Sequence, residues 1–218
     1  MSVYYPVLLR LEGKRCVVIG GGWGTENRVK DLLDADALVT LISPVGFRVI
    51  EELAARGRLR WEARDYQSGD LEGAFLVVAC PFDRSRNAEL WAEAEARGIP
   101  VNAVDDQPHC TFIFPAVHRQ GDLVVAVSSA GKSPALAVWI RDRIARQFGP
   151  EYGEFLNLLG GLRPEVIRLF QGFKRRQPVW RRLIGSAAID HIREGRPDAA
   201  RRALQNVLEE ETQPRPIL

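Results

Sequence analysis

Long apolar runs are missing from this chain of 218 residues. No window approaches the roughly 18 apolar residues that a membrane helix needs. The N-terminus also lacks a basic start followed by a long apolar stretch, so no signal peptide is expected. Both absences argue against a membrane partner.

Cysteine and histidine are scarce, at three residues each. The cysteines are odd in number and widely spaced, which excludes a disulfide framework and a structural zinc site. Cys16 and Cys80 lie in apolar runs and are expected in the core. The histidines show no His-x-x-x-His spacing, so no permanent metal is predicted. Unpaired cysteines suit a reducing compartment, and we expect the protein to be cytoplasmic.

A large excess of one charge is absent as well, because the formal net charge is only +2. This balance gives no reason to expect nucleic acid as a partner. Basic side chains nevertheless outnumber acidic ones between residues 163 and 202, most densely at Lys174, Arg175, Arg176, Arg181 and Arg182. That stretch either binds an anionic partner or forms solvated helix faces.

The first half of the chain alternates short apolar runs with helical patterns. Strands are predicted at Cys16–Gly20, Leu38–Ile42, Leu59–Ala63, Phe75–Ala79 and Ile99–Val104. Helices are predicted between them at Glu26–Ala35, Val45–Arg56 and Asp83–Arg97. This alternation predicts an α/β fold in which helices cover both faces of a parallel sheet.

The second half has a different pattern. Thr111–His118 and Asp122–Ser128 are predicted to pair as antiparallel strands, because only the short polar turn Arg119–Gly121 separates them. Helices are predicted after them at Ala135–Phe148 and over residues 154–172, 178–194 and 197–210.

A glycine-rich turn joins the first predicted strand to the first predicted helix, with the residues Gly20, Gly21, Gly22, Trp23, Gly24 and Thr25. Glycine permits the tight bend and a close approach of the backbone to a diphosphate, which the helix N-terminus then holds. The pattern predicts a Rossmann-type dinucleotide site. The alternative is a tight turn that binds no ligand.

The end of the second predicted strand bears on the choice of cofactor. An acidic residue normally binds the ribose of NAD there, but this chain has Ser43, Pro44 and Val45. Ser43 can still hydrogen-bond a ribose, and Arg48 is the first candidate for a 2′-phosphate. The pattern favours NAD over NADP without demonstrating it.

Several stretches match a known family in order and spacing: Tyr5–Leu11, Gly13–Arg15, Gly20–Gly22, Leu38–Pro44, Arg97–Asp106, Phe112–Ala116 and Ala126–Pro134. Together they resemble the precorrin-2 dehydrogenase and sirohydrochlorin ferrochelatase family, which includes the N-terminal part of siroheme synthases. The resemblance covers about residues 4–145.

The resemblance implies NAD-dependent oxidation of precorrin-2, a tetrapyrrole, to sirohydrochlorin by a homodimer. It also implies a Rossmann domain over residues 1–112, a dimerisation region over 113–148 and a helical C-terminal region over 149–218. Some family members also insert ferrous iron, so chelation stays open as a second activity. A non-catalytic protein that binds dinucleotide or tetrapyrrole is the third possibility.

The chain departs from the family pattern within the glycine turn. Gly24 and Thr25 replace the usual valine and alanine. Trp23 and Gly24 occupy the positions that touch the cofactor, where the indole could stack beside the nucleotide or obstruct it. Ala130 stands where a second glycine is common, and Asp36 replaces a glycine after the first helix. Aspartate tolerates a left-handed helix end better than most residues.

Asp105 is the predicted catalytic residue. It follows the fifth predicted strand, at the sheet edge where open α/β folds bind ligands, and it matches the family's aspartate in the Asn-x-Val-Asp motif that starts at Asn102. An ionised carboxylate there can accept a proton. The alternative is a loop or capping aspartate. His109, four residues on, either assists with protons or is an exposed loop histidine.

Precorrin-2 carries eight carboxylates, so its binding site requires hydrogen-bond donors and cations. The predicted substrate-binding residues are Asn102, Ser128, Ser129, Lys132 and Ser133. The last four lie in a glycine-containing turn that leads into a helix, which is a natural anion site.

Overall fold

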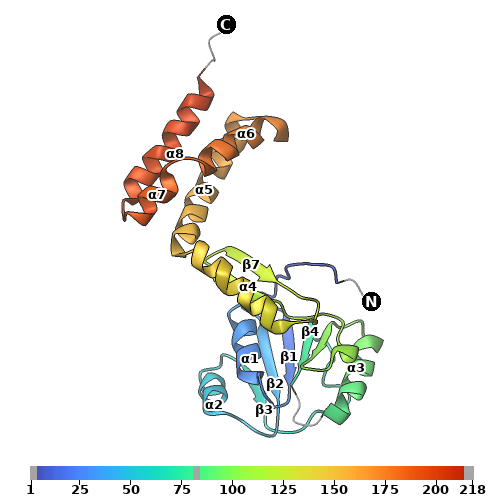
Figure 1. Ribbon diagram of the computed structural model, residues 1–218. Coiled ribbons are helices and arrows are strands. Elements are labelled where there is room, and N and C mark those ends of the chain that lie inside the picture. The colour runs from blue at the N-terminus through green and yellow to red at the C-terminus, as the bar shows by residue number, and fades with distance from the viewer. Residues whose placement is uncertain (1–3, 81–83, 214–218) are drawn as a thin grey trace. The chain divides into compact units, whose positions relative to one another are not determined.

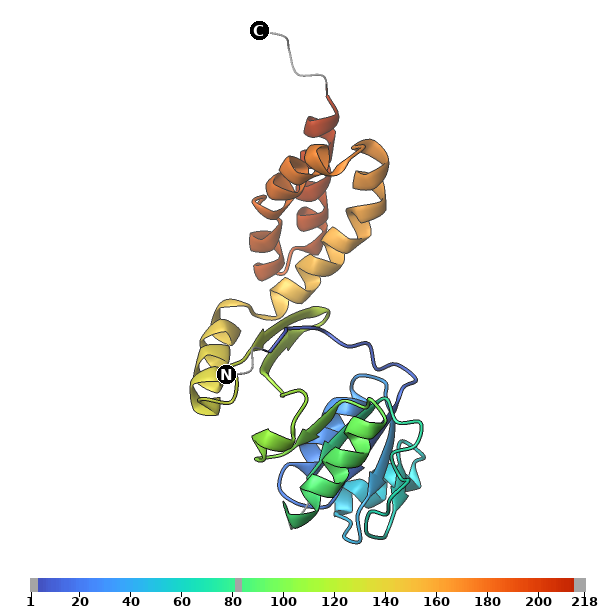
Figure 2. The ribbon, with the colours of Figure 1, turned by 90° about the vertical axis from the view of Figure 1, so that its right-hand side faces the viewer.

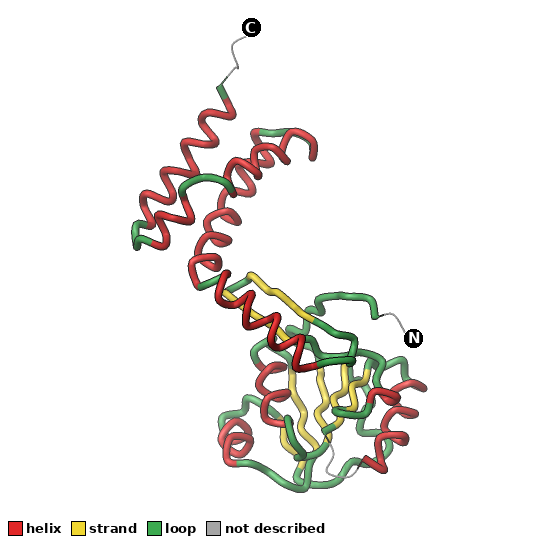
Figure 3. The backbone as a smooth tube through the Cα atoms, in the orientation of Figure 1, coloured by secondary structure: helices red, strands yellow, loops and turns green. Residues whose placement is uncertain are grey.

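The computed structural model describes residues 4–80 and 84–213. The chain divides into two compact units, Met1–Phe114 and Pro115–Leu218. The first unit contains a sheet with helices on both faces, and the second contains a strand pair and a group of helices (Figures 1 and 3). This order of elements confirms the predicted fold class.

The sheet of the first unit has five parallel strands in the order β3-β2-β1-β4-β5. They are β1 (Arg15–Ile19), β2 (Leu38–Ile42), β3 (Arg60–Glu62), β4 (Leu76–Ala79) and β5 (Val101–Ala103). The connecting helices α1 (Thr25–Leu33) and α2 (Arg48–Ala55) lie on one face, and α3 (Asn87–Ala96) lies on the other (Figure 1). The chain also forms two 3-10 turns. The first, η1 (Arg84–Arg86), directly precedes α3, and the second, η2 (Gln107–His109), follows β5. The predicted start of the third helix, Asp83, lies outside the described residues.

Alternation along the central strands explains why both faces of the sheet are buried. Cys16 and Val18 pack with the apolar residues of α1 and α2, whereas Val17 and Ile19 pack with those of α3. Successive side chains on a strand point to opposite faces, so a continuous apolar run suits a sheet that is covered twice.

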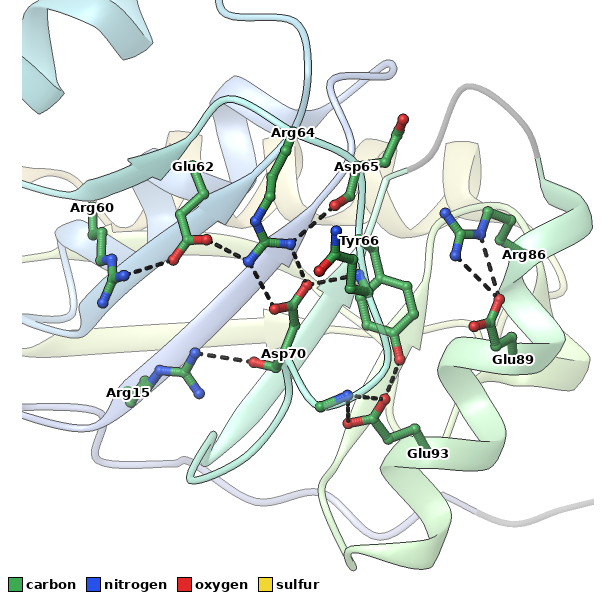
Figure 4. Close-up of polar contacts among 12 residues, drawn as sticks. Arg15, Arg60, Glu62, Arg64, Asp65, Tyr66, Asp70, Arg86, Glu89 and Glu93 are labelled. Atoms are coloured by element: carbon green, nitrogen blue, oxygen red, sulfur yellow. Dashed lines mark hydrogen bonds and ion pairs between the residues drawn. The ribbon is translucent and has the colours of Figure 1, made fainter.

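A polar network braces the long connection between β3 and β4 (Figure 4). The Arg64 guanidinium donates to both carboxylate oxygens of Asp70, at 2.7 and 2.8 Å, and it also pairs with Glu62. Farther along the connection, the buried Tyr66 donates to Glu93 of α3. The network ties this connection to α3.

The second unit begins with the antiparallel pair β6 (Ala116–Gln120) and β7 (Leu123–Val127), followed by α4 (Pro134–Gln147). The predicted strand at Thr111–His118 is wrong in its bounds. Phe112 and Phe114 pack against the core of the first unit instead, and the Phe114 ring lies 4.1 Å from the Arg28 guanidinium. Because these two rings pack against that core, residues 111–115 do not join the strand pair, and β6 begins at Ala116.

The remaining helices, which lie together in Figure 2, are α5 (Pro150–Leu169), α6 (Phe173–Ile184), α7 (Ala188–Arg193) and α8 (Pro197–Thr212). Their buried apolar side chains form one core. The single helix predicted over residues 178–194 is wrong, because the chain leaves α6 at Gly185 and restarts at Ala188. Gly153 of α5 lies so close to β6 that a Cβ atom would stand 2.9 Å from the Gln120 carbonyl oxygen. None of the helices in the described part of the chain could span a bilayer.

Candidate functional site

The carboxyl ends of three neighbouring strands are level with one another. Ile19 of β1 pairs with Ala79 of β4, and Ala79 pairs with Ala103 of β5. The glycine turn after Ile19 and the turn after Ala103 therefore leave the sheet at the same edge, two strand spacings apart, which is roughly 10 Å. Ligands of doubly wound sheets bind at this edge.

Backbone hydrogen bonds fasten the glycine turn to the strands on both sides. The Gly20 amide donates to Ile42 O of β2 at 2.8 Å, and the Gly22 amide donates to Cys80 O after β4 at 2.9 Å. Gly20 and Gly24 have φ angles of 89° and 88°, which a residue with a side chain rarely adopts. The sequence thus places glycine where the bend requires it.

The bend presents backbone donors to an incoming anion. Within residues 4–80 and 84–213, the amides of Trp23, Gly24 and Glu26 have no hydrogen-bond acceptor. These amides surround the N-terminus of α1, where the helix dipole adds partial positive charge. The arrangement fits the diphosphate of a dinucleotide.

Thr25 occupies a position where glycine or alanine is usual. Its side chain is fully buried, and its hydroxyl lies 2.8 Å from Gly22 O and 3.1 Å from Gly20 O. The hydroxyl therefore stabilises the bend by a hydrogen bond to its backbone carbonyls. Trp23, in contrast, is 84% exposed, so its indole does not fill the bend.

The turn after β2 is also internally braced. The buried Ser43 hydroxyl donates to Val45 O at 2.7 Å, and the Trp61 indole donates to Ser43 O at 3.0 Å. The predicted ribose contact from the Ser43 side chain is therefore disfavoured, because that hydroxyl already has a partner. Pro44 and Val45 are exposed at this strand end.

Asp105 is exposed in the turn after β5 and has a φ angle of 58°. Hydrogen bonds from two neighbouring side chains, Asn102 and Cys110, hold this turn in place. The Asn102 amide donates to Phe112 O at 2.9 Å, and the Cys110 thiol lies 3.2 Å from both the amide and the carbonyl of Ala103. Burial raises the pKa of the Cys110 thiol, so it stays protonated. Asn102 is buried, and its side chain positions the turn that carries Asp105.

Three side chains near Asp105 in the sequence and in α3 form a hydrogen-bonded series. This series was not predicted from the sequence. Asp106 Oδ2 is 2.8 Å from Asn87 Nδ2 of α3 and 2.8 Å from His109 Nδ1. Asn87 carries no motif of its own. The only signal in the sequence is its position at the start of the helix that follows β4, at the ligand-binding edge of the fold.

In the second unit, the predicted substrate-binding serines form one turn before α4. Ser128 accepts from the Ala130 amide at 3.1 Å, Ser129 from the Ser133 amide at 3.0 Å, and Ser133 caps the helix by accepting from the Leu136 amide at 3.3 Å. Each hydroxyl acts as an acceptor here, so its own hydrogen remains available for donation. Lys132 is exposed in the same turn.

Comparison with known families decides the relationship of the first unit. A family model described as putative NAD(P)-binding matches residues 7–116, which is half of the chain. The chain belongs to this family. Models described as the sirohaem biosynthesis protein central region and the sirohaem synthase dimerisation region match residues 120–147 and 151–208. The three matches confirm the predicted resemblance to the N-terminal part of siroheme synthases.

Curated relatives of this family are named siroheme synthase. One from Methylococcus capsulatus is 36% identical over 92% of this chain and 42% of its own length. Another from Methylobacillus flagellatus is 35% identical over 93% of this chain and 44% of its own length. The chain thus spans less than half the length of these relatives.

A solved structure described as "SirC, precorrin-2 dehydrogenase" has a similar fold. Its TM-score against this chain is 0.67 at 23% sequence identity, and the match covers 95% of this chain and 98% of that one. The likeness supports the order of sheet, strand pair and helices described above. Among the described residues, histidine, cysteine and acidic side chains form no group of three that could hold a metal ion.

Proposed function

We propose that this protein oxidises precorrin-2 to sirohydrochlorin with NAD as the hydride acceptor. The observation that carries the proposal is the shared sheet edge, where the amide-lined bend at residues 20–25 and Asp105 leave strands that end level with each other. Family membership and the relatives named siroheme synthase support the same pathway.

Each part of the edge has a task in this reaction. The amides of Trp23, Gly24 and Glu26 bind the diphosphate, and the exposed Pro44 and Val45 border the adenosine ribose. When bound, the nicotinamide supplies hydride acceptance, which the protein alone cannot provide. Asp105 accepts the proton that the macrocycle loses.

Discrimination between NAD and NADP falls on the turn after β2. Arg48, the first basic residue there, is exposed and forms a surface ion pair with Glu52 at 3.0 Å. An adenosine 2′-phosphate would compete with the Glu52 carboxylate for this cation, which favours NAD over NADP.

The second unit would bind the carboxylates of the substrate and a second copy of the chain. The turn with Ser128, Ser129, Lys132 and Ser133 offers hydroxyl, amide and ammonium donors for acetate and propionate arms. The match to a dimerisation region at residues 151–208 supports a homodimer. The proposed domain limits are 1–112, 113–148 and 149–218, and the matched dimerisation region lies in the third of these domains rather than in 113–148.

The decisive experiment supplies purified protein with precorrin-2 and NAD and follows sirohydrochlorin and NADH by absorption. We expect turnover by the wild type and a loss of at least about 10²-fold in kcat for Asp105→Ala, because a positioned proton acceptor is removed. NAD affinity, measured by calorimetry, stays unchanged in this variant. Asp34→Ala, at an exposed aspartate after α1, is the matched control.

Other outcomes separate the alternatives. Normal turnover by Asp105→Ala removes this residue from the mechanism, and no heat with NAD or NADP overturns the redox assignment. Sirohydrochlorin with ferrous iron tests chelation separately. Tetrapyrrole binding without turnover in either assay favours a non-catalytic binding protein.

A further inference from the structure

Three side chains form a hydrogen-bonded chain beside Asp105. Asn87 is 1% exposed, and its amide donates to Asp106 Oδ2, which also lies 2.8 Å from His109 Nδ1. The His109 amide donates to Asp106 O at 3.0 Å, which fixes the backbone of the same turn. The imidazole and the Trp91 ring pack in a T-shaped arrangement, with 6.1 Å between the ring centroids. His109 is therefore held from several sides.

The chain determines which imidazole nitrogen carries the hydrogen. A carboxylate only accepts hydrogen bonds, so the partner nitrogen, Nδ1, must be the donor. The neutral ring then has its lone pair on Nε2. The His109 side chain is 30% exposed, and Nε2 has no hydrogen bond within the described residues. Nε2 thus belongs to a partly exposed side chain and has its lone pair available to accept a proton.

The arrangement retains a local energetic cost. Asn87 Oδ1 is buried and has no partner in the described parts of the chain, because the amide is turned so that its nitrogen meets Asp106. A buried polar atom without a partner loses the hydrogen bonds it would make with water, which is destabilising. Departures of this kind are concentrated at functional sites.

We propose that His109 is a proton carrier that takes the proton from Asp105 and releases it to water; this inference rests on the proposed function. Precorrin-2 gives up one hydride, which leaves with its electron pair, and one proton, which the Asp105 carboxylate accepts. The proton then passes to His109 Nε2, directly or through water, and Asp106 stabilises the imidazolium. Release of the proton to solvent restores both groups. Imidazole suits this task because one ring nitrogen can accept a proton while the other donates its hydrogen bond to a carboxylate.

The test compares His109→Ala and His109→Gln in the precorrin-2 assay. For both variants we expect kcat to fall by about 10²-fold, within the range for positioned proton transfer, while KM and the NAD dissociation constant stay unchanged. Added imidazole restores turnover of His109→Ala, because the free base replaces the missing carrier. The glutamine retains a donor to Asp106 but cannot carry a proton, so wild-type turnover by His109→Gln overturns the proposal.

A second measurement does not depend on turnover. Nitrogen-15 NMR of the labelled full chain is expected to show the hydrogen of neutral His109 on Nδ1, and Asp106→Ala, which removes the acceptor, is expected to abolish this preference. A hydrogen on Nε2 in the wild type overturns the proposal even if the enzyme is active. An inactive wild type with the hydrogen on Nδ1 overturns the proposed function instead, so the two failures are distinguishable.

Discussion

At the scale of residues, positive φ angles mark positions where the fold imposes a demand on the backbone. In the described chain, such angles occur outside glycine at Asp36 (56°), Asp105 (58°) and Ala130 (52°). Asp36 ends the turn after α1, as the sequence predicts for an aspartate that replaces glycine. Asp105 is the proposed catalytic residue, and strained backbone is concentrated at active sites. Ala130 occupies a position where the family commonly has glycine.

Ala130→Gly is expected to stabilise the protein by about 1 kcal/mol, because the left-handed conformation costs alanine that much relative to glycine. Thermal unfolding followed by circular dichroism checks this. Ala135→Gly, in the first turn of α4, is the matched control and should lower the stability instead, since glycine is a poor helix former. A lower melting temperature for Ala130→Gly would show that its methyl group makes contacts worth more than the strain.

Site residues were predictable where a local pattern dictates the backbone. Gly20 and Gly24 occupy the bend because positive φ angles require them, and such a requirement is visible in the sequence. The roles of Ser43 and Asn87 were not predictable. The Ser43 hydroxyl donates to Val45 O, and Asn87 hydrogen-bonds Asp106, which lies 19 positions further along the chain. Hydrogen bonds of this kind depend on how the elements pack.

At the scale of elements, the five parallel strands were predictable because buried β-strands appear as short apolar runs between helical patterns. The exact first and last residues of the strands and helices were less predictable. Phe112 and Phe114 look like part of a strand, yet they cover the first core, and β6 begins only at Ala116. The break between α6 and α7 escaped prediction because the apolar period continues across Gly185.

The connection between β3 and β4 makes stability depend on pH. The Arg64 guanidinium, together with the Gln67 amide, holds the pKa of Asp70 below its usual range although burial opposes this. A lowered native pKa contributes stability that is present above the unfolded value of about 3.9 and lost as pH falls through the native value.

Asp70→Asn is therefore expected to lower the free energy of unfolding by about 2 kcal/mol at pH 7, as for other hydrogen bonds between charged groups. Urea denaturation at a series of pH values checks it, and the gap from the wild type should narrow below about pH 4. Asp65→Asn, at an exposed carboxylate nearby, is the control and should change little. A gap that persists unchanged in acid would show that the charge of Asp70 is not its source.

At the scale of the whole molecule, the second unit leaves apolar side chains uncovered. Leu136 and Trp139 on α4 are 50% and 55% exposed, and no residue of β7 is buried. A two-stranded sheet alone is only marginally stable in water, so β6 and β7 depend on packing against other elements. These surfaces support the proposed homodimer, whose existence only the family resemblance could predict from sequence.

Trp139→Glu is expected to weaken the dimer by at least about tenfold, because it removes the exposed indole and places in an apolar interface a carboxylate that has only Arg143 of the same helix beside it. Light scattering during size-exclusion chromatography, at a series of concentrations, measures this. Leu38→Glu, at an equally exposed apolar residue at the start of β2, should leave the mass at twice that of the chain. A dimer of unchanged strength in Trp139→Glu would exclude this face of α4 from the interface.

The turn after β2 limits how the coenzyme preference of this protein can be engineered. A Cβ atom at Gly46 would lie 2.3 Å from the Trp61 ring, so an arginine cannot be introduced there without displacing the indole that holds Ser43. A designer who seeks a phosphate-binding cation must begin at Val45 or recruit Arg48 from Glu52. The Trp61 indole that fixes the turn after β2 therefore also limits which substitutions could change the coenzyme preference of the protein.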